Sequence, residues 1–148
     1  MTHPIIILGA GYTGRYIASA LITTSCPFFA TSREPDKNLS HVPVDRRMKF
    51  DLEQPSTWSN IPAGANLVWC FPATPLTTVQ RWAGTHHYSQ FKRLVVLGST
   101  SSYEVSDDST EYPPPWIDES APIDLTKPRV QGEEFLRTDC GAIVLRVA

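Results

Sequence analysis

The sequence predicts an α/β fold: a doubly wound parallel sheet with the strand order 3-2-1-4-5-6 and helices on both faces. Three observations predict it. Strand-like apolar runs alternate with helical or crossover segments from one end of the chain to the other. The first run, at residues 4–8, contains four consecutive aliphatic side chains, as is typical of a central strand covered on both faces. A glycine-rich turn follows this run at once and opens a helical pattern.

The expected boundaries follow from periodicity and from breaker residues. Residues 34–47 are polar and contain proline, which indicates a loop with at most a short helix, and residues 55–60 are expected to form a helical turn. Residues 98–122 are rich in Ser, Pro and Asp and are too long for a routine connection. The remaining strands are expected at residues 28–31, 48–51, 67–71, 94–97 and 142–146, and the helices at residues 15–24, 76–87 and 127–138.

Length and composition favour one globular domain. The chain has 148 residues, 41% of them hydrophobic and 19% charged, so we expect residues 1–148 to form a single domain that ends after the sixth strand. The net charge of −2, without a basic block, argues against nucleic acid and against a membrane surface. Cys26, Cys70 and Cys140 are odd in number and widely spaced, which indicates neither disulfides nor a metal site. A cytoplasmic location is therefore expected.

Three glycines after the first strand form the pattern G-x-G-x-x-G in the context that gives it meaning, between a buried strand and a helix. Gly9 permits a tight turn, Gly11 lets the backbone approach a diphosphate, and Gly14 allows the helix to pack closely on the strand. The N-terminus of the following helix would then present free N–H groups to the phosphates, and Tyr12 and Thr13 within the turn are expected to belong to the cofactor site. The pattern predicts dinucleotide binding; the alternative is a glycine-rich turn without a ligand.

The end of the second strand predicts which dinucleotide is preferred. Sites specific for NAD place an acidic residue there, which binds the ribose 2′-hydroxyl. Here Ser32 and Arg33 offer a hydroxyl and a guanidinium, which suit a 2′-phosphate. Glu34 comes one residue later and is the main argument for NAD. We therefore expect NADP to be preferred, with NAD as a possible cofactor; the alternative for Arg33 is a solvated loop cation.

From the glycine turn onward, the chain resembles the extended and atypical short-chain dehydrogenases/reductases, the NAD-dependent epimerase/dehydratase group of nucleoside-diphosphate-sugar enzymes. The resemblance extends over essentially the whole chain and implies a Rossmann domain that binds NAD or NADP. The matching stretches are residues 9–15, Asp51-Leu52, Phe71-Pro72-Ala73, residues 97–103, residues 118–122, residues 131–136 and residues 144–148.

The resemblance implies two more contacts with the adenine half of the cofactor. Asp51 and Leu52 are similar to the acidic–aliphatic pair that lies beside the adenine in this group. Phe71, Pro72 and Ala73 take the place of the loop that passes under the adenine ribose.

The resemblance also implies an active site, which this sequence keeps only in part. The group uses a Ser or Thr to hold the substrate oxygen, a Tyr as acid/base and a Lys one helical turn later. Ser99 occupies the Ser/Thr position and is the expected catalytic residue. Leu125 and Arg129 stand where the Tyr and the Lys should be. Leucine cannot exchange a proton, and arginine stays charged, so the usual pair is absent.

Three functions remain open at this stage. The leading one is an oxidoreductase or epimerase-type domain that acts on a small carbonyl or hydroxyl compound, of which a nucleotide-sugar-like molecule is one candidate. The second is a non-catalytic NADP-binding regulator or scaffold, which the missing Tyr and Lys favour. The third is a structural fragment that binds nothing in isolation.

For the other candidate side chains a structural role is favoured. Tyr103 and Tyr112 could replace the missing acid/base, but a packing or surface tyrosine is the favoured interpretation. His86 and His87 end a helix, where a solvated pair is favoured over a metal site. The proline-rich residues 112–116 are expected to form a stiff loop over a pocket mouth rather than to dock a proline-recognition domain.

Enzymes of the extended group continue beyond the sixth strand into a segment that builds much of the substrate pocket, whereas this sequence ends at Ala148. A truncated chain, a natural fragment and a minimal cofactor-binding module would all have this form. A sixth strand left unpaired at the sheet edge would favour association, so a homo-oligomer is a further expectation.

Overall fold

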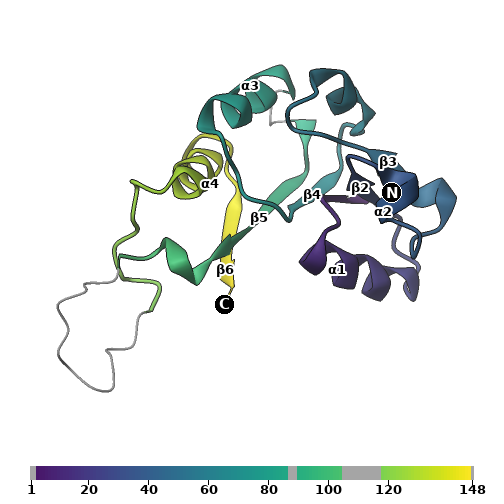
Figure 1. Ribbon diagram of the computed structural model, residues 1–148, viewed down its shortest axis with the longest axis horizontal. Helices are drawn as coiled ribbons and strands as arrows, with labels where there is room; N and C mark the ends of the chain where they lie inside the picture. The colour runs from purple at the N-terminus through teal and green to yellow at the C-terminus, as the bar shows by residue number, and fades with distance from the viewer. Residues whose placement is uncertain (1–2, 87–89, 105–117, 148) are drawn as a thin grey trace.

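A computed structural model describes residues 3–86, 90–104 and 118–147 of the chain. All strands of its sheet are parallel and lie in the order β3-β2-β1-β4-β5-β6, which confirms the predicted doubly wound topology (Figure 1). The strands are β1 (Ile5–Leu8), β2 (Phe28–Ser32), β3 (Arg47–Lys49), β4 (Asn66–Trp69), β5 (Arg93–Ser99) and β6 (Ile143–Val147).

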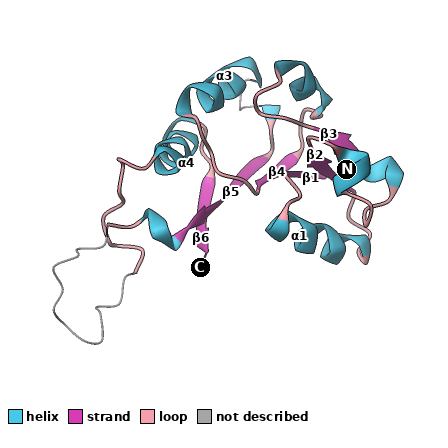
Figure 2. Cartoon of the chain, in the orientation of Figure 1, coloured by secondary structure: helices cyan, strands magenta, loops and turns pink. Residues whose placement is uncertain are grey.

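The helices, which are cyan in Figure 2, differ from expectation mainly at their ends. The first helix begins at Tyr12, because the last residues of the glycine turn already have helical geometry. The last helix begins at Pro128. Proline lacks an N–H, but a residue in the first turn of a helix has no intrahelical acceptor for one, so no helical hydrogen bond is lost there. The helices are α1 (Tyr12–Ile22), α2 (Pro35–Asn38), α3 (Leu76–His86) and α4 (Pro128–Asp139), with short 3₁₀ turns at Val44–Arg46, Pro55–Asn60 and Thr100–Ser102.

Most strands also differ by a residue or more from the predicted lengths; β4, for example, is Asn66–Trp69 instead of residues 67–71. The fifth strand is longer than residues 94–97, because β4 and β6 pair with it on both sides and extend its ladder from Arg93 to Ser99. The third strand is shorter than residues 48–51, because its partner β2 ends at Ser32. A single further bond, from the N–H of Phe50 to Ser32 O, follows at 3.0 Å.

The sheet separates two apolar cores. Successive residues of a strand point to opposite faces, so each central strand supplies both cores. On one face α3 and α4 cover a core that contains Trp58, Trp69 and Trp82, all at most 2% exposed (Figure 1). On the other face α1 packs through Ala18 onto Ile7 and the neighbouring residues of β1 and β2.

The face that carries α1 is covered only over part of its width. The register places Val68, Val95 and Ile143 side by side across β4, β5 and β6 on this face. Ile143, Leu145 and Val147 remain 54%, 47% and 48% exposed, respectively. None of the described helices lies over these three strands on this side of the sheet (Figure 1). Among the described residues, the sheet therefore has the expected strand order, but no helix covers β4, β5 and β6 on the face that carries α1, which is called the bare face below.

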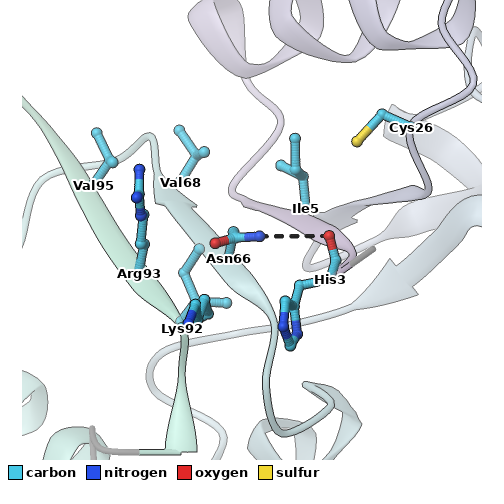
Figure 3. A pocket seen from close by; sticks show the side chains of 9 residues that line it. His3, Ile5, Cys26, Asn66, Val68, Lys92, Arg93 and Val95 are labelled. Atoms are coloured by element: carbon cyan, nitrogen blue, oxygen red, sulfur yellow. Dashed lines mark hydrogen bonds between the residues drawn. The ribbon is translucent and has the colours of Figure 1, made fainter. Parts of the chain in front are cut away.

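A shallow hollow of about 530 Å³ lies on this bare face (Figure 3). It is formed at the amino ends of β1, β4 and β5, where Asn66 Nδ2 donates a 3.4 Å hydrogen bond to His3 O. Ligands of open α/β sheets bind outside the carboxyl ends of the strands. The hollow is thus at the wrong end of the sheet for a dinucleotide.

Candidate dinucleotide site

Gly9 forms the tight turn after β1. Its φ of +77° lies in the left-handed region, and a Cβ at this position would come within 2.5 Å of the Phe71 ring. Thr31 holds the turn in place. Its hydroxyl accepts a hydrogen bond from Gly9 N at 2.9 Å, and its carbonyl accepts one from Ala10 N at 2.8 Å. Sequence reasoning missed Thr31; the only signal was a polar residue near the end of an otherwise buried strand.

The other two glycines differ in what surrounds them. A Cβ on Gly14 would come within 2.9 Å of Gly9 O and 3.0 Å of Ile7 Cγ2, so α1 packs on β1 at a distance that only glycine permits. A Cβ on Gly11 would meet no atom within 4 Å. The space beside Gly11 is therefore open, as the approach of a diphosphate to the backbone requires.

The first turn of α1 leaves its backbone donors free of side-chain caps. Gly11 is the N-cap residue and makes no side-chain capping bond, and the first turn contains no acidic residue. The N–H groups of Tyr12, Thr13 and Gly14 cannot bond within the helix, since the carbonyl groups four residues earlier lie before its first turn; the first intrahelical bond runs from Arg15 N to Gly11 O at 3.0 Å. Together with the helix dipole they form a site suited to an anion. Tyr12 is 81% exposed, so its side chain is not packed against the rest of the fold.

At the end of β2 the structure gives Ser32 and Glu34 definite partners. Ser32 Oγ accepts hydrogen bonds from Glu34 N at 3.2 Å and from Asn38 Nδ2 at 2.9 Å, which leaves its own proton available for donation. The Glu34 carboxylate pairs with Lys37 at 3.2 Å. Arg33, between them, is exposed. The position thus presents one hydroxyl and one guanidinium, while a lysine partly neutralises the nearby acid.

The expected adenine contacts divide into exposed and buried residues. Phe71 is half-buried and Pro72 is exposed, so both are accessible at the end of β4. Leu52 is 7% exposed and Ala73 is fully buried, so their side chains belong to the core. Asp51 Oδ1 accepts a hydrogen bond from Glu53 N at 3.0 Å. Of the proposed adenine pocket, the structure therefore leaves mainly Asp51, Phe71 and Pro72 open to a ligand.

Ser99 lies at the carboxyl end of β5, where it caps a 3₁₀ turn. Its hydroxyl oxygen accepts hydrogen bonds from Ser101 N at 3.2 Å and from Ser101 Oγ at 2.9 Å. Lys127 reaches the same turn from the start of α4, and its ammonium donates to Ser101 O at 2.6 Å. Sequence reasoning did not select Ser101 or Lys127.

Arg129 does not replace the missing lysine, because its guanidinium is bound to a buried carboxylate. Arg129 Nε donates to Glu133 Oε1 at 2.9 Å, and Nη2 lies 3.5 Å from Leu97 O. Glu133 is 0% exposed, and Gly98 provides its space, since a Cβ there would lie 2.9 Å from Glu133 Oε2. Burial of a charged carboxylate is costly unless an opposite charge lies beside it, so the Arg129 guanidinium is needed as the partner of Glu133.

Neither Leu125 nor Tyr103 supplies an acid/base group. Leu125 is 56% exposed at the position of the missing tyrosine. Tyr103 is 5% exposed, forms a β-bridge with Ile123, and has the Arg146 guanidinium 5.5 Å from its ring centre, which fits a packing role. Tyr112, His87 and residues 113–116 lie outside the described residues.

Residues 3–86, 90–104 and 118–147 contain neither a metal-binding cluster nor a membrane-spanning helix. No group of three or more His, Cys, Asp or Glu side chains there could hold a metal ion. No helix in these ranges has the length and apolar character needed to cross a membrane.

Solved structures provide the comparison with known proteins. A short-chain dehydrogenase/reductase superfamily protein from Agrobacterium tumefaciens with bound NAD has a TM-score of 0.69 at 20% identity. A conserved protein of unknown function from Silicibacter pomeroyi has a TM-score of 0.65 at 21% identity. The UDP-glucuronic acid 4-epimerase from Bacillus cereus, in complex with UDP-4-deoxy-4-fluoro-glucuronic acid and NAD, has a TM-score of 0.61 at 12% identity. The chain has the Rossmann fold.

The alignments cover 97%, 98% and 95% of this chain but only 48%, 53% and 54% of those structures, in the same order. The chain thus spans about half the length of the structures it matches. At these identities the likeness shows the fold alone. No family model matches the sequence, and no curated protein does.

Proposed function

We propose that the chain is the cofactor-binding domain of a short-chain dehydrogenase/reductase or epimerase-type protein, and that it binds a nicotinamide dinucleotide at the carboxyl ends of its strands. The observation that carries this proposal is the uncapped start of α1 beside the open space at Gly11. A diphosphate there would receive backbone hydrogen bonds and the favourable end of the helix dipole. Two solved structures with this fold contain NAD, which supports the proposal.

NADP is the proposed preferred cofactor. A 2′-phosphate at the end of β2 would meet the Ser32 hydroxyl and the Arg33 guanidinium. Glu34 is the residue that would favour a free 2′-hydroxyl, but its carboxylate is paired with Lys37, and this pairing reduces its repulsion of a phosphate. Two of the solved neighbours contain NAD, so the preference for NADP rests on these residues alone.

Calorimetric titration with NADP and with NAD tests both parts of the proposal. Wild type should bind NADP more tightly, and Arg33→Ala should weaken NADP by about tenfold while NAD changes little, since a charge-assisted bond to phosphate is lost. Arg93→Ala is the matched control, because Arg93 is an exposed arginine at the amino end of β5. Equal losses for both cofactors would refute the role of Arg33, and the absence of binding to either would refute the proposal as a whole.

A specific observation favours a second candidate function, a non-catalytic NADP-binding regulator. Leu125 cannot exchange a proton, and Arg129 is held by Glu133. The two candidates differ in turnover. A panel of carbonyl and hydroxyl compounds, monitored at the nicotinamide absorbance, would reveal an enzyme, and Ser99→Ala should then abolish its turnover. Cofactor binding without turnover of any compound would support the regulator.

A further inference from the structure

The hollow at the amino ends of β1, β4 and β5 has an apolar floor. Strand pairing places Val68 beside Val95, and the side chains of both valines and of Ile5 lie in a row on the same face of the sheet (Figure 3). All three residues are half-buried, so each keeps apolar surface in contact with water. Neighbouring strands are about 4.8 Å apart, so the row is about 10 Å long and can accommodate an alkyl chain of medium length.

Two cations border this floor. Lys92 precedes β5, Arg93 is its first residue, and both are exposed. In Figure 3 the Arg93 side chain extends beside Val68 and Val95. None of the residues that line the hollow is acidic, and none of the ion pairs among the described residues includes Lys92 or Arg93. The described part of the chain therefore leaves the positive charge of this rim without a counter-ion.

Hydrogen bonds hold the rim in place. Lys92 N donates to Ala65 O at 2.9 Å, and Asn66 N donates to Pro4 O at the same distance. The Asn66 side chain adds its 3.4 Å bond to His3 O (Figure 3). The segments that precede β1, β4 and β5 are thus tied to one another. A ligand would meet a preformed surface, which reduces the entropy lost on binding.

Size and chemistry together indicate the class of ligand. The volume of about 530 Å³ lies within the range of about 300–1,000 Å³ that is typical of small-molecule sites. The apolar floor suits a hydrocarbon chain, because covering it removes apolar surface from water. The cations at one end of the floor suit an anionic head group, because a carboxylate accepts charge-assisted hydrogen bonds from both. An amphipathic anion satisfies both requirements.

We propose that the hollow binds an aliphatic carboxylate of medium chain length. The carboxylate would bond to Lys92 and Arg93, and the alkyl chain would lie along Ile5, Val68 and Val95. Because the hollow is shallow, the chain would keep one side in water, and the affinity should be modest but should rise with chain length. The inference does not depend on dinucleotide binding, since the two sites are at opposite ends of the sheet.

The experiment varies the head group and the alkyl chain separately. Octanoate is compared with octanol, which lacks the negative charge, and with butanoate, which has a shorter chain. Each is titrated into the protein, and the backbone amide signals are followed by two-dimensional NMR. The variants are Lys92→Gln/Arg93→Gln, Val95→Thr and the control Lys49→Gln, which removes an exposed lysine from β3 at the other side of the sheet. Thermal unfolding without ligand shows whether each variant retains the fold.

Octanoate should shift the amide signals at the amino ends of β4 and β5 and should bind about tenfold more tightly than butanoate, because its longer chain covers more of the floor. The double variant should weaken octanoate by about tenfold and leave octanol unchanged, since only the charged head group loses its partners. Val95→Thr should weaken octanoate and octanol alike, by about threefold, because a hydroxyl replaces a methyl group in the floor. Lys49→Gln should change none of these affinities.

Three results would overturn the inference. Equal losses of octanoate and octanol in the double variant would mean that the charges do not select the ligand. Equal affinities for octanoate and butanoate would mean that the floor contributes nothing. A lack of octanoate binding would overturn it as well, and sedimentation equilibrium would then show whether a second copy of the chain covers the hollow. The double variant should bind NADP as wild type does, and a changed NADP affinity would contradict the separation of the two sites.

Discussion

The two faces of strands β4, β5 and β6 differ in coverage, although these strands carry aliphatic side chains on both. On the face beneath α3 and α4, Leu67 and Val96 are at most 1% exposed. On the opposite face, Ile143 and Leu145 keep about half of their surface in water. Because the transfer free energy scales with the apolar area removed from water, similar side chains contribute very differently to stability on the two sides. Aliphatic residues in a strand indicate which side chains can be buried, and the helices that pack on each face determine which side chains are buried.

The largest effect is expected where α4 meets the end of β4. A Cβ on Gly132 would overlap the carbonyl oxygen of Ala73, so Gly132→Ala would force α4 away from the covered face. We expect the free energy of unfolding, measured in urea, to fall by at least about 3 kcal/mol. Gly84→Ala on α3 is the matched control, since its Cβ would meet no atom, and it should raise stability by about 0.5–1 kcal/mol. Similar effects of both substitutions would contradict this account of the helix contact.

A leucine on each face provides the most direct comparison. Leu67→Ala should lower the free energy of unfolding by about 3 kcal/mol, because it creates a cavity under α3 and α4. Leu145→Ala should cost less than about 1 kcal/mol, because the side chain is already 47% exposed. Chemical denaturation of both variants measures the two losses. A cost at Leu145 as large as that at Leu67 would mean that the bare face is covered in solution.

Removal of the buried Glu133 side chain should lower the free energy of unfolding more than removal of the exposed Glu34 side chain. Glu133→Ala removes the partner of Arg129 and leaves the Ser102 hydroxyl without its 3.4 Å acceptor. Arg129 is partly exposed and can regain water, so the expected loss is about 2 kcal/mol. Glu34→Ala, in an exposed pair with Lys37, should cost less than about 0.5 kcal/mol. The same urea titrations distinguish the two, and equal losses would refute the special role of Glu133.

The smallest expected effect is a pH dependence at the contact between α4 and β6. Glu134 bonds to Arg137 at 2.7 Å and to Arg146 of β6 at 3.0 Å. The hydrogen bond from Arg137, and to a smaller degree the one from Arg146, holds the pKa of Glu134 below its ordinary value of 4.5. The stabilisation is therefore complete at neutral pH and is lost as the pH falls through the folded-state pKa. Glu134→Gln should reduce the fall in stability between about pH 6 and pH 3 by less than about 1 kcal/mol. An unchanged pH profile of unfolding would show that this pair contributes nothing.

Much of the architecture could be predicted because its signals are local. Ile5–Leu8 is apolar on both faces and is followed directly by the glycine pattern, so neighbouring residues alone indicate the central strand and the helix after it. The accommodation of Gly14 against β1 also follows from that spacing. Element ends were less predictable: β5 extends to Arg93 and Ser99 because of partners on both sides, which its own residues do not reveal.

The candidate site was predicted less completely, because its contacts join residues that are distant in the chain. Thr31 stabilises the turn at Gly9 across 22 positions, and Lys127 bonds to Ser101 across 26. Leu52 and Ala73 follow the expected third and fourth strands, but their side chains are buried in the core, which a sequence motif cannot show.

The strand order and the open space beside Gly11 could be predicted from the sequence itself, since the first follows from the alternation of strands and helices around the glycine pattern and the second from the small size of glycine. The tertiary structure alone decided that Arg129 is bound to Glu133, that Lys127 remains accessible, and that half of one sheet face is bare. Those outcomes depend on where α4 docks and on which helices reach each face, and docking is a balance of contacts made across the whole fold.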